Sequence, residues 1–406
     1  MRWFLVHSII HTAARFIRAV FYREKNMKFV HLSDLHLGKR VGEFSMLEEQ
    51  KHILAQIIGI IAEEKPDGVF IAGDIYDKAL PSAEAVVLFD DFLVQLAALR
   101  TQVFIISGNH DSPERLAFGN RLIDAGGIHI SPVYSGEIKP FSIVGECGTA
   151  DIYMLPFIKP ANVRACFPDE KIESYTDAVR LAVDKMRINK SSMNILLTHQ
   201  FVTGAERSDS EDKISVGGTD NVDASVFDGF DYVALGHIHK PQNIGTERIR
   251  YCGTPLKYSF SEAGQDKSVT VAELNGKRCL NVRTIPLVPL HDMHEISGKY
   301  AELTLKSFYE KTTYMNDYMH ITLTDEDDIP DAVMKLRTIY RNLMKLDYDN
   351  TRTRHSADVN GAQAVESKSP LELFSEFFEL RNGSEMSPEQ SEFMAKIIES
   401  VWEEEE

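Results

Sequence analysis

The sequence predicts an α/β protein in which β-sheets are flanked by helices. Between residues 27 and about 282, short apolar runs rich in β-branched residues alternate with helical patterns. Polar residues of the kinds that bind metals directly follow five of the apolar runs. Because ligands of open α/β sheets gather at the carboxyl ends of strands, these observations predict one functional site at one edge of the fold.

Strands and helices alternate over the first two-thirds of the chain. We expect strands near 28–33, 68–73, 102–107, 128–133, 141–144, 150–154, 194–198, 231–235, 249–252, 268–273 and 279–285. We expect helices at 46–65, 83–99, 113–125 and 174–187. The polar loop 203–225 is too long for an ordinary connection, which indicates either a functional loop or disorder.

The pattern changes after residue 285. Residues 286–349 predict a small α+β unit with helices near 298–308 and 329–343 and a strand at 318–324. Residues 350–369 are polar and nearly free of large apolar groups, as in a linker. The final segment, 370–406, predicts two short helices, 371–380 and 388–402, whose apolar faces need a surface to pack on.

Residues 1–26 form an N-terminal extension that we expect to be dispensable, because the first strand begins after Met27. Histidines and arginines interrupt its apolar stretch, so it is a poor bilayer span, and it lacks a signal-peptide pattern. The four cysteines are widely spaced without a CxxC motif, which is typical of reduced thiols. We therefore expect a cytoplasmic protein without stable membrane association.

The net charge of −17 limits the possible partners. Nucleic-acid binders usually present a basic surface. If this chain binds a polyanion, the binding must depend on metal ions, on local basic loops or on another subunit.

The polar residues at the strand ends form five motifs. They are Asp34-Leu35-His36, Gly73-Asp74, Gly108-Asn109-His110-Asp111, Thr198-His199 and Gly236-His237-Ile238-His239. A single Asp or His at a strand end is more often a cap or turn residue than a ligand. Seven candidate ligands at five strand ends, however, predict a metal site. Mixed carboxylate, amide and imidazole ligands suit a divalent transition metal such as Mn²⁺, with Mg²⁺ or Fe²⁺ as alternatives. One carboxylate can bridge two cations, which leaves His110 free to act as an acid.

These motifs resemble the ordered motifs of calcineurin-like metallophosphoesterases. The flanking segments 31–38, 251–255 and 259–262 resemble, more narrowly, the nuclease subunits of bacterial SbcCD complexes. The resemblance implies a sandwich of β-sheets flanked by helices as the metallophosphoesterase domain, residues 27–285. It also implies a capping domain at 286–349 and C-terminal helices that bind an SbcC-type ATPase subunit.

The resemblance also assigns residues to roles. It implies that one metal is held by Asp34, His36, Asp74 and His239, and a second by Asp74, Asn109, His199 and His237. Asp74 would then bridge two divalent ions, with Mn²⁺ preferred over Mg²⁺, and His110 would be catalytic. Archaeal and eukaryotic relatives carry a His where Asp77 stands, so the resemblance gives Asp77 at most a supporting role or a contact on the phosphate side.

The implied activity is a Mn²⁺-dependent DNA exonuclease and endonuclease that acts on DNA ends and hairpins in repair, recombination and replication. The ATPase partner would drive the double-strand activity. The family also implies a homodimer within a heterotetramer. Helix 83–99 is more apolar than one buried stripe requires, which fits either ordinary core or such a homodimer. Six basic residues in loops after the motifs are candidate DNA contacts, although ordinary surface charge explains each singly as well: Lys39, Arg40, Lys78, Arg115, Arg207 and Lys213.

Two other functions remain open from the sequence. A stand-alone metallophosphoesterase would act on a small-molecule or protein phosphoester. Protein phosphatases of the superfamily carry GDxxDRG and GNHE, whereas here Lys78 and Ala79 follow Asp77, and Asp111 follows His110. A non-catalytic scaffold would be expected to have lost ligands, and none of the expected ligands is missing.

Overall fold

The computed structural model describes residues 26–120, 124–211, 220–351, 353, 369–382 and 385–404. Of the predicted N-terminal extension, only Asn26 falls within these ranges. The predicted contact residue Lys213 and most of the predicted linker 350–369 also lie outside them.

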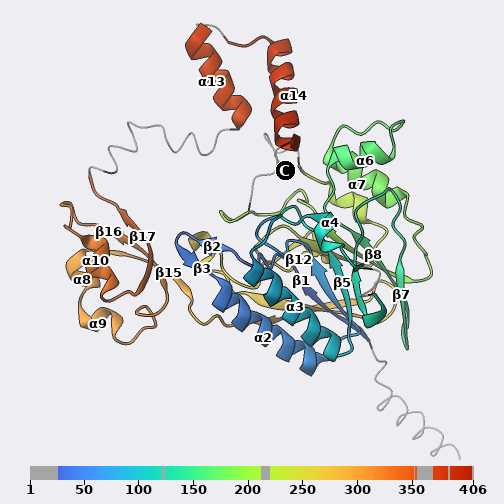
Figure 1. Ribbon diagram of the computed structural model, residues 1–406, viewed down its shortest axis with the longest axis horizontal. Coiled ribbons are helices and arrows are strands. Elements are labelled where there is room, and N and C mark those ends of the chain that lie inside the picture. Colours follow the sequence, from blue (N-terminus) through green and yellow to red (C-terminus); the bar gives the residue numbers. More distant parts are fainter. Residues whose placement is uncertain are drawn as a thin grey trace, which may run out of the picture.

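Two six-stranded sheets form the core (Figure 1). The first sheet has the order β14 (Leu280–Pro286), β13 (Ser268–Leu274), β1 (Met27–Leu32), β4 (Gly68–Ala72), β5 (Gln102–Ile106) and β6 (Ile128–Ile130). Strands β1, β4, β5 and β6 are parallel, whereas β13 and β14 are antiparallel. The near-continuous apolar sequence of the parallel strands fits their burial on both faces.

The second sheet has the order β11 (Gln242–Ile244), β12 (Thr246–Tyr251), β10 (Tyr232–Gly236), β9 (Met193–His199), β8 (Gly148–Leu155) and β7 (Phe141–Gly145). Strands β12, β10, β9 and β8 are parallel, and β11 and β7 are antiparallel at the edges. The inner faces of the two sheets share one apolar core, in which Phe29, Phe70 and Phe104 pack with Ile195 and Tyr232. The predicted sandwich is therefore confirmed.

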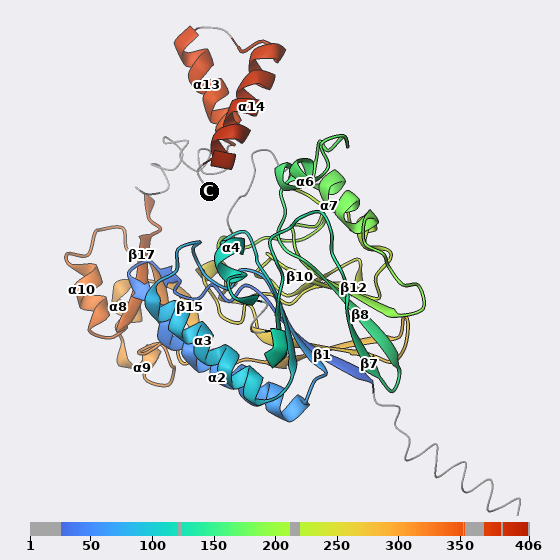
Figure 2. The same ribbon diagram turned by 45° about the vertical axis from the view of Figure 1, so that its right-hand side comes forward.

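Helices cover the outer faces of both sheets (Figure 2). Helices α2 (Leu47–Glu64) and α3 (Ala83–Ala98) lie side by side on the first sheet and share a core with β1, β4 and β5. Helices α6 (Pro160–Cys166) and α7 (Tyr175–Asp184), with the short η2 (Ala224–Phe227), cover the second sheet. Each predicted helix in these positions is confirmed, and α6 is an addition to the prediction.

A smaller unit follows β14 of the first sheet in the chain and has its own core. It contains the parallel strands β15 (Met293–Gly298), β16 (Tyr318–Leu323) and β17 (Asn342–Tyr348), with α8 (Tyr300–Leu303), α9 (Lys306–Tyr309) and α10 (Ala332–Arg337). Arg337 pairs with Glu43, which lies between β2 (Arg40–Val41) and β3 (Phe44–Ser45). His291 pairs with Glu49 of α2 at 2.6 Å. These contacts join the small unit to the β2–β3 turn and to α2 of the sandwich.

Three predicted helices differ from the structure. Within the described part of predicted helix 113–125, α4 (Pro113–Leu116) ends before Gly119, whose φ is 74°, and Asp124–Gly126 form the 3₁₀ turn η1. Predicted helix 298–308 is divided into α8 and α9, where the Thr304 hydroxyl bonds to the Tyr300 carbonyl. Predicted helix 329–343 ends at Arg337, and the chain continues into β17, a strand that periodicity did not reveal.

The chain ends in a helical pair, α13 (Pro370–Asn382) and α14 (Pro388–Glu404). In both views the pair stands apart from the two sheets (Figures 1 and 2). The two predicted C-terminal helices are confirmed. No helix among the described residues is long and apolar enough to cross a membrane.

Candidate metal centre

All seven predicted metal ligands come together where the two sheets meet. They lie at or just after the carboxyl ends of five parallel strands: Asp34 and His36 after β1, Asp74 after β4, Asn109 after β5, His199 at the end of β9, and His237 and His239 after β10. Six of the seven are buried, and Asn109 is half-buried. Burying so many polar groups in one place is costly unless they are paired or bind a cation.

The backbone at this edge is held in unusual conformations. Asp34, His36, Asp74 and His237 have φ values of 53°, 44°, 50° and 102°, a region that residues other than glycine rarely adopt. Strained residues of this kind cluster at functional sites, where the surrounding fold enforces them. A Cβ on Gly108 would lie 2.1 Å from Asp74 Oδ1, so only glycine lets the two loops approach this closely.

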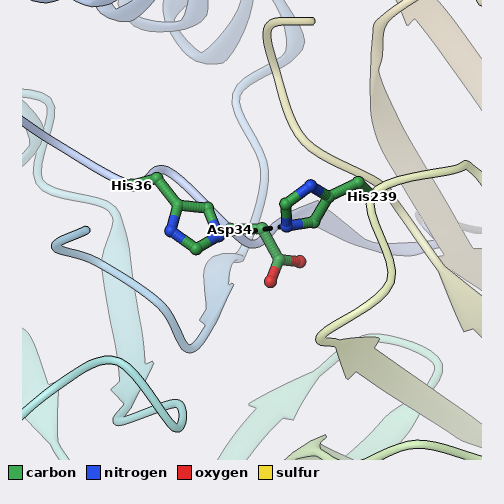
Figure 3. A group of neighbouring side chains, drawn as sticks. All are labelled: Asp34, His36 and His239. Atoms are coloured by element: carbon green, nitrogen blue, oxygen red, sulfur yellow. Dashed lines mark hydrogen bonds between the residues drawn. The ribbon is translucent and has the colours of Figure 1, made fainter. Parts of the chain in front are cut away.

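The first ligand group consists of Asp34, His36 and His239 (Figure 3). His36 Nε2 and His239 Nε2 face each other at 3.1 Å, and His36 Nδ1 has no hydrogen-bond partner. Burial lowers the pKa of His36 well below its usual range, so its ring is neutral. Burial also raises the pKa of Asp34 to about 6. Facing imidazole nitrogens beside a buried carboxylate fit a shared divalent cation.

The second group consists of Asn109, His199 and His237 with Asp74. His199 Nδ1 donates to the Ala72 carbonyl at 2.9 Å, so in the neutral ring Nε2 is left with a lone pair. That Nε2 lies 3.0 Å from Asn109 Oδ1 and 3.2 Å from Asp74 Oδ2, and His237 Nδ1 lies 3.0 Å from the same Asn109 oxygen. Acceptor atoms that converge in this way fit a cation at their centre.

Asp74 lies between the two groups. Its Oδ2 is 3.2 Å from His199 Nε2 and 3.7 Å from His36 Nε2. Burial opposes ionisation, but the neighbouring histidines outweigh it and hold the pKa of Asp74 well below its usual range. Burial lowers the pKa of His199, yet Asp74 and Asp34 outweigh that effect and raise it to about 9. A cation at this position would replace the proton of His199.

His110 differs from the ligands in its orientation and exposure. Its Nδ1 lies 3.0 Å from the main-chain carbonyl of Asp77, which fixes the proton on Nδ1. Its Nε2 is 3.9 Å from Asp74 Oδ2, and 15% of the side chain remains exposed. The ring is therefore oriented by a main-chain atom and is more exposed than the predicted ligand histidines around it.

Several supporting residues were not predicted from the sequence. Asp111 is part of a predicted motif, but the sequence assigned it no role. Its carboxylate accepts hydrogen bonds from the main-chain N–H groups of Gly108, Ile75 and Tyr76 at 2.9–3.1 Å. It therefore ties the loops after β4 and β5 together. Burial raises the pKa of Asp111 to about 6.

A second supporting set surrounds His239 and comprises Ser210, Glu211, Glu262 and Lys267. Although burial acts against ionisation, contacts with His239 and Lys267 lower the pKa of Glu262 to about 2. Glu262 belongs to η3 (Phe260–Glu262). Segment 259–262, which carries part of the family resemblance, was the only feature of the sequence that pointed to this supporting set.

The predicted DNA contacts are placed unevenly. Lys39 pairs with Asp77 at 2.8 Å and is 16% exposed, so its charge is largely committed within the protein. Arg207 pairs with the buried Asp220 and lies 3.8 Å above the Phe201 ring. The remaining described candidates are exposed and lie in loops after the motifs: Arg40, Lys78 and Arg115.

The chain is similar to two family models, to a curated relative and, at low similarity, to a solved structure. A family model for calcineurin-like phosphoesterases matches residues 27–241, and a model described as the type 5 capsule protein repressor C-terminal domain matches residues 289–382. The chain is 33% identical over 375 residues to the D subunit of the SbcCD nuclease of Staphylococcus epidermidis, a match that covers 92% of this chain and 98% of that relative. Among solved structures, a dimetal phosphatase from Danio rerio is 12% identical with a TM-score of 0.37, covering 64% of this chain and 99% of that one.

The family match spans more than half of the chain, and the curated relative is similar over nearly its whole length. The buried carboxylate and imidazole cluster is what a metal-dependent hydrolase of this kind requires. The chain belongs to the calcineurin-like phosphoesterases and, among them, to the family of the D subunits of SbcCD nucleases.

Proposed function

We propose that this chain is the nuclease subunit of an SbcCD-type complex and hydrolyses phosphodiester bonds of DNA. The observation that carries the proposal is that the similarity to a nuclease subunit extends through the sandwich, the small unit and into the C-terminal region. A stand-alone phosphatase would need only the sandwich. We infer exonuclease activity on duplex ends and endonuclease activity on single-stranded or hairpin DNA, with roles in repair, recombination and replication.

The residues at the functional edge fit two divalent ions. We assign one to Asp34, His36, Asp74 and His239 and the other to Asp74, Asn109, His199 and His237, with Asp74 shared. The mixture of imidazole nitrogens with carboxylate and amide oxygens favours Mn²⁺ over Mg²⁺, because Mg²⁺ prefers oxygen ligands. Bound there, the two ions would polarise the scissile phosphate and make a hydroxide available near neutral pH.

His110 is the residue that we assign to proton transfer. Its Nδ1 is held by the Asp77 carbonyl, so Nε2 is the nitrogen that can carry a proton to the leaving oxygen. The partial exposure of His110 suits this role, since the substrate must reach it, whereas the metal ligands are withdrawn behind it. Asp77 acts through its main chain in this assignment, and its carboxylate holds Lys39.

DNA is the substrate that we propose, although the chain carries a net charge of −17. Phe201 and Asp220 hold the guanidinium of Arg207 in one position, and its charge, like that of Lys39, is paired within the protein. Arg40, Lys78 and Arg115 are exposed and can meet phosphates farther along the strand. These few cations cannot bind a long duplex strongly, which favours a complex in which a partner adds basic surface.

We propose two assemblies. We propose that α13 and α14 bind the SbcC-type ATPase, since Phe377 and Phe393 expose 54% and 64% of their surface on these helices. We propose a homodimer through α3, on which Val86, Val87 and Val94 are exposed. Together these contacts would give a heterotetramer.

The test is a cleavage assay of the full chain with and without its ATPase partner. Linear duplex, circular single-stranded and hairpin DNA would each be incubated with Mn²⁺ or Mg²⁺. We expect Mn²⁺-dependent cleavage of single-stranded DNA by the chain alone, and ATP-dependent digestion of duplex ends only with the partner. A fully metal-loaded chain that hydrolyses a small phosphomonoester but leaves every DNA intact would contradict the proposal.

A further inference from the structure

His239 is held by parts of the chain that are remote from its own motif. Its main-chain N–H donates to Glu211 Oε1 at 2.7 Å, and its ring Nδ1 lies 2.5 Å from Ser210 Oγ. Its main-chain carbonyl accepts from the ammonium of Lys267 at 3.0 Å. Three separate polar groups of one residue are thus occupied by side chains from two other segments.

These contacts close into a ring. Ser210 Oγ donates to Glu262 Oε1, and the other oxygen of Glu262 accepts from Lys267 at 2.5 Å. Lys267 then returns to the His239 carbonyl. The path therefore runs from the imidazole through Ser210, Glu262 and Lys267 back to the same histidine.

The direction of the hydrogen bonds determines the tautomer of the His239 imidazole. Because the single Ser210 hydroxyl proton goes to the Glu262 carboxylate, Ser210 Oγ must accept from His239. Nδ1 of the neutral imidazole then carries the proton, and Nε2, which faces His36, is left with its lone pair. The nitrogen that faces the site is thus kept free of a proton.

Stability alone does not account for burying the charged groups of this hydrogen-bonded path. Glu262 is fully buried and the Lys267 side chain is 4% exposed, and a buried ion pair often contributes no more stability than apolar residues of the same volume. By contrast, His199 takes its orientation from one main-chain carbonyl, and His36 Nδ1 has no hydrogen-bond partner. His239 therefore differs from His199 and His36, because the side chains of Ser210, Glu262 and Lys267 hold it in place.

We propose that Ser210, Glu211, Glu262 and Lys267 form a clamp that positions His239, and that the affinity of one of the two metal sites depends on this clamp. The inference rests on the proposed metal function and deepens it. Ser210 and Glu211 belong to the polar loop 203–225, so the clamp also gives that loop a function. Outer-shell partners of metal-binding histidines change metal affinity by about 10- to 100-fold when they are removed.

The test is calorimetric titration of the metal-free full chain with Mn²⁺ alone. We expect Ser210→Ala and Glu262→Gln to bind one of the two ions about 10- to 100-fold more weakly and the other ion normally. Ser210→Thr restores the hydroxyl and should recover the affinity. Matched controls are Ser225→Ala and Glu247→Gln, which replace exposed residues away from His239.

A second readout follows the tautomer directly. In the metal-free chain with ¹⁵N-labelled histidine, the His239 signals, identified by their loss in His239→Ala, should show a protonated Nδ1. Ser210→Ala should shift them toward a mixture of the two tautomers. If Glu262→Gln fails to fold because it disturbs a buried ion pair, Ser210→Ala decides the question, since Ser210 is half-buried in a loop.

The outcomes separate the clamp from the metal site. Unchanged Mn²⁺ affinity and an unchanged tautomer in Ser210→Ala would overturn the clamp and leave the metal site standing. A loss of both ions together with a lower melting temperature would also overturn it, because the effect would not be selective. Two tightly bound ions in His239→Ala would instead exclude His239 as a ligand, whereas a parent chain that binds no Mn²⁺ tightly would refute the proposed metal function itself.

Discussion

The Nδ1 atom of His110 lies 3.0 Å from the main-chain carbonyl oxygen of Asp77. The side chain of Asp77 points elsewhere and pairs with Lys39 at 2.8 Å. The imidazole is therefore oriented by a backbone atom, which no side-chain substitution at position 77 removes. This arrangement separates the roles of the two residues and makes them testable.

Replacing His110 should reduce turnover without removing metal. If His110 protonates the leaving oxygen, His110→Ala should lower kcat by about 10²- to 10⁴-fold, the usual contribution of general acid catalysis. Metal analysis of the purified variant checks the second half of the prediction. Parallel loss of metal and activity would make His110 a ligand, an assignment that its position 3.9 Å from Asp74 Oδ2 also allows.

Asp77→Asn should have a much smaller effect than His110→Ala. The carbonyl that orients His110 remains, and what is lost is the negative charge that faces Lys39 at 2.8 Å and His36 Nδ1 at 3.7 Å. We expect kcat to stay within about tenfold of the parent chain, a change of about 1.4 kcal/mol or less in the activation barrier, because His110 keeps the carbonyl that orients it. A loss as large as that of His110→Ala would show that the Asp77 carboxylate takes part in catalysis.

Asp74→Ala should abolish hydrolysis and reduce the bound metal. Asp74 Oδ2 lies within 3.2 Å of His199 and 3.7 Å of His36, so it is the one carboxylate placed to neutralise both ions. Metal content per chain, measured after extensive dialysis, is the readout. Retention of two tightly bound ions would exclude Asp74 as the bridging ligand.

The functional edge could be predicted because its ligands follow strands that are each recognisable from a short, continuous apolar run. Asp34, Asp74 and His199 each come at the end of a buried strand, and the parallel arrangement brings such ends together. Strand β17 could not be found in this way, because Asn342–Tyr348 alternates weakly between buried and exposed positions. Its pairing with β16 decides its structure.

The residues that support the site were beyond sequence reasoning for a different reason. Ser210 and Glu262 are 52 positions apart, and neither has a periodic or local pattern that points to the other. The contacts of Asp209 and Ser210 with η3 bring Ser210 and Glu262 to His239. Asp111 was visible within its motif, but its three main-chain partners come from two loops whose approach depends on Gly108.

Metal affinity should fall as the pH falls, in two stages. His199 has a pKa of about 9 without metal, so below that pH a proton competes with the cation for its Nε2. Asp34 has a pKa of about 6, so a second competing proton appears below pH 6. Each competing proton should lower the apparent Mn²⁺ affinity of its site by about tenfold per pH unit.

Calorimetry in buffers of different ionisation enthalpy measures the protons released on Mn²⁺ binding. Between pH 6 and 9 we expect release from His199, and below pH 6 additional release from Asp34. His199→Ala should remove the pH dependence of its site in the upper range. Proton release that does not change between pH 5 and pH 8 would contradict the assignment of these two groups.

Removal of the C-terminal helices should separate catalysis from assembly. Asn350 is buried and its side chain bonds to the Asp325 carbonyl, so a chain that ends after residue 353 keeps the small unit intact. Because α13 and α14 contribute no residue to the metal centre, Mn²⁺-dependent cleavage of single-stranded DNA should survive in this truncated chain. Co-purification with an SbcC-type ATPase and ATP-stimulated digestion of duplex ends should both be lost.

Point variants sharpen the same prediction within the full chain. Phe377→Ser and Phe393→Ser remove exposed aromatic groups that are suited to a groove on a partner, and each should weaken the pull-down of the ATPase. Glu389→Ser, at the start of α14, is the control and should bind normally. If the truncated chain still binds the ATPase with full affinity, the helices are not the tether. Their apolar faces must then pack on the rest of the same chain. In that case the truncated chain should have a lower melting temperature than the full chain.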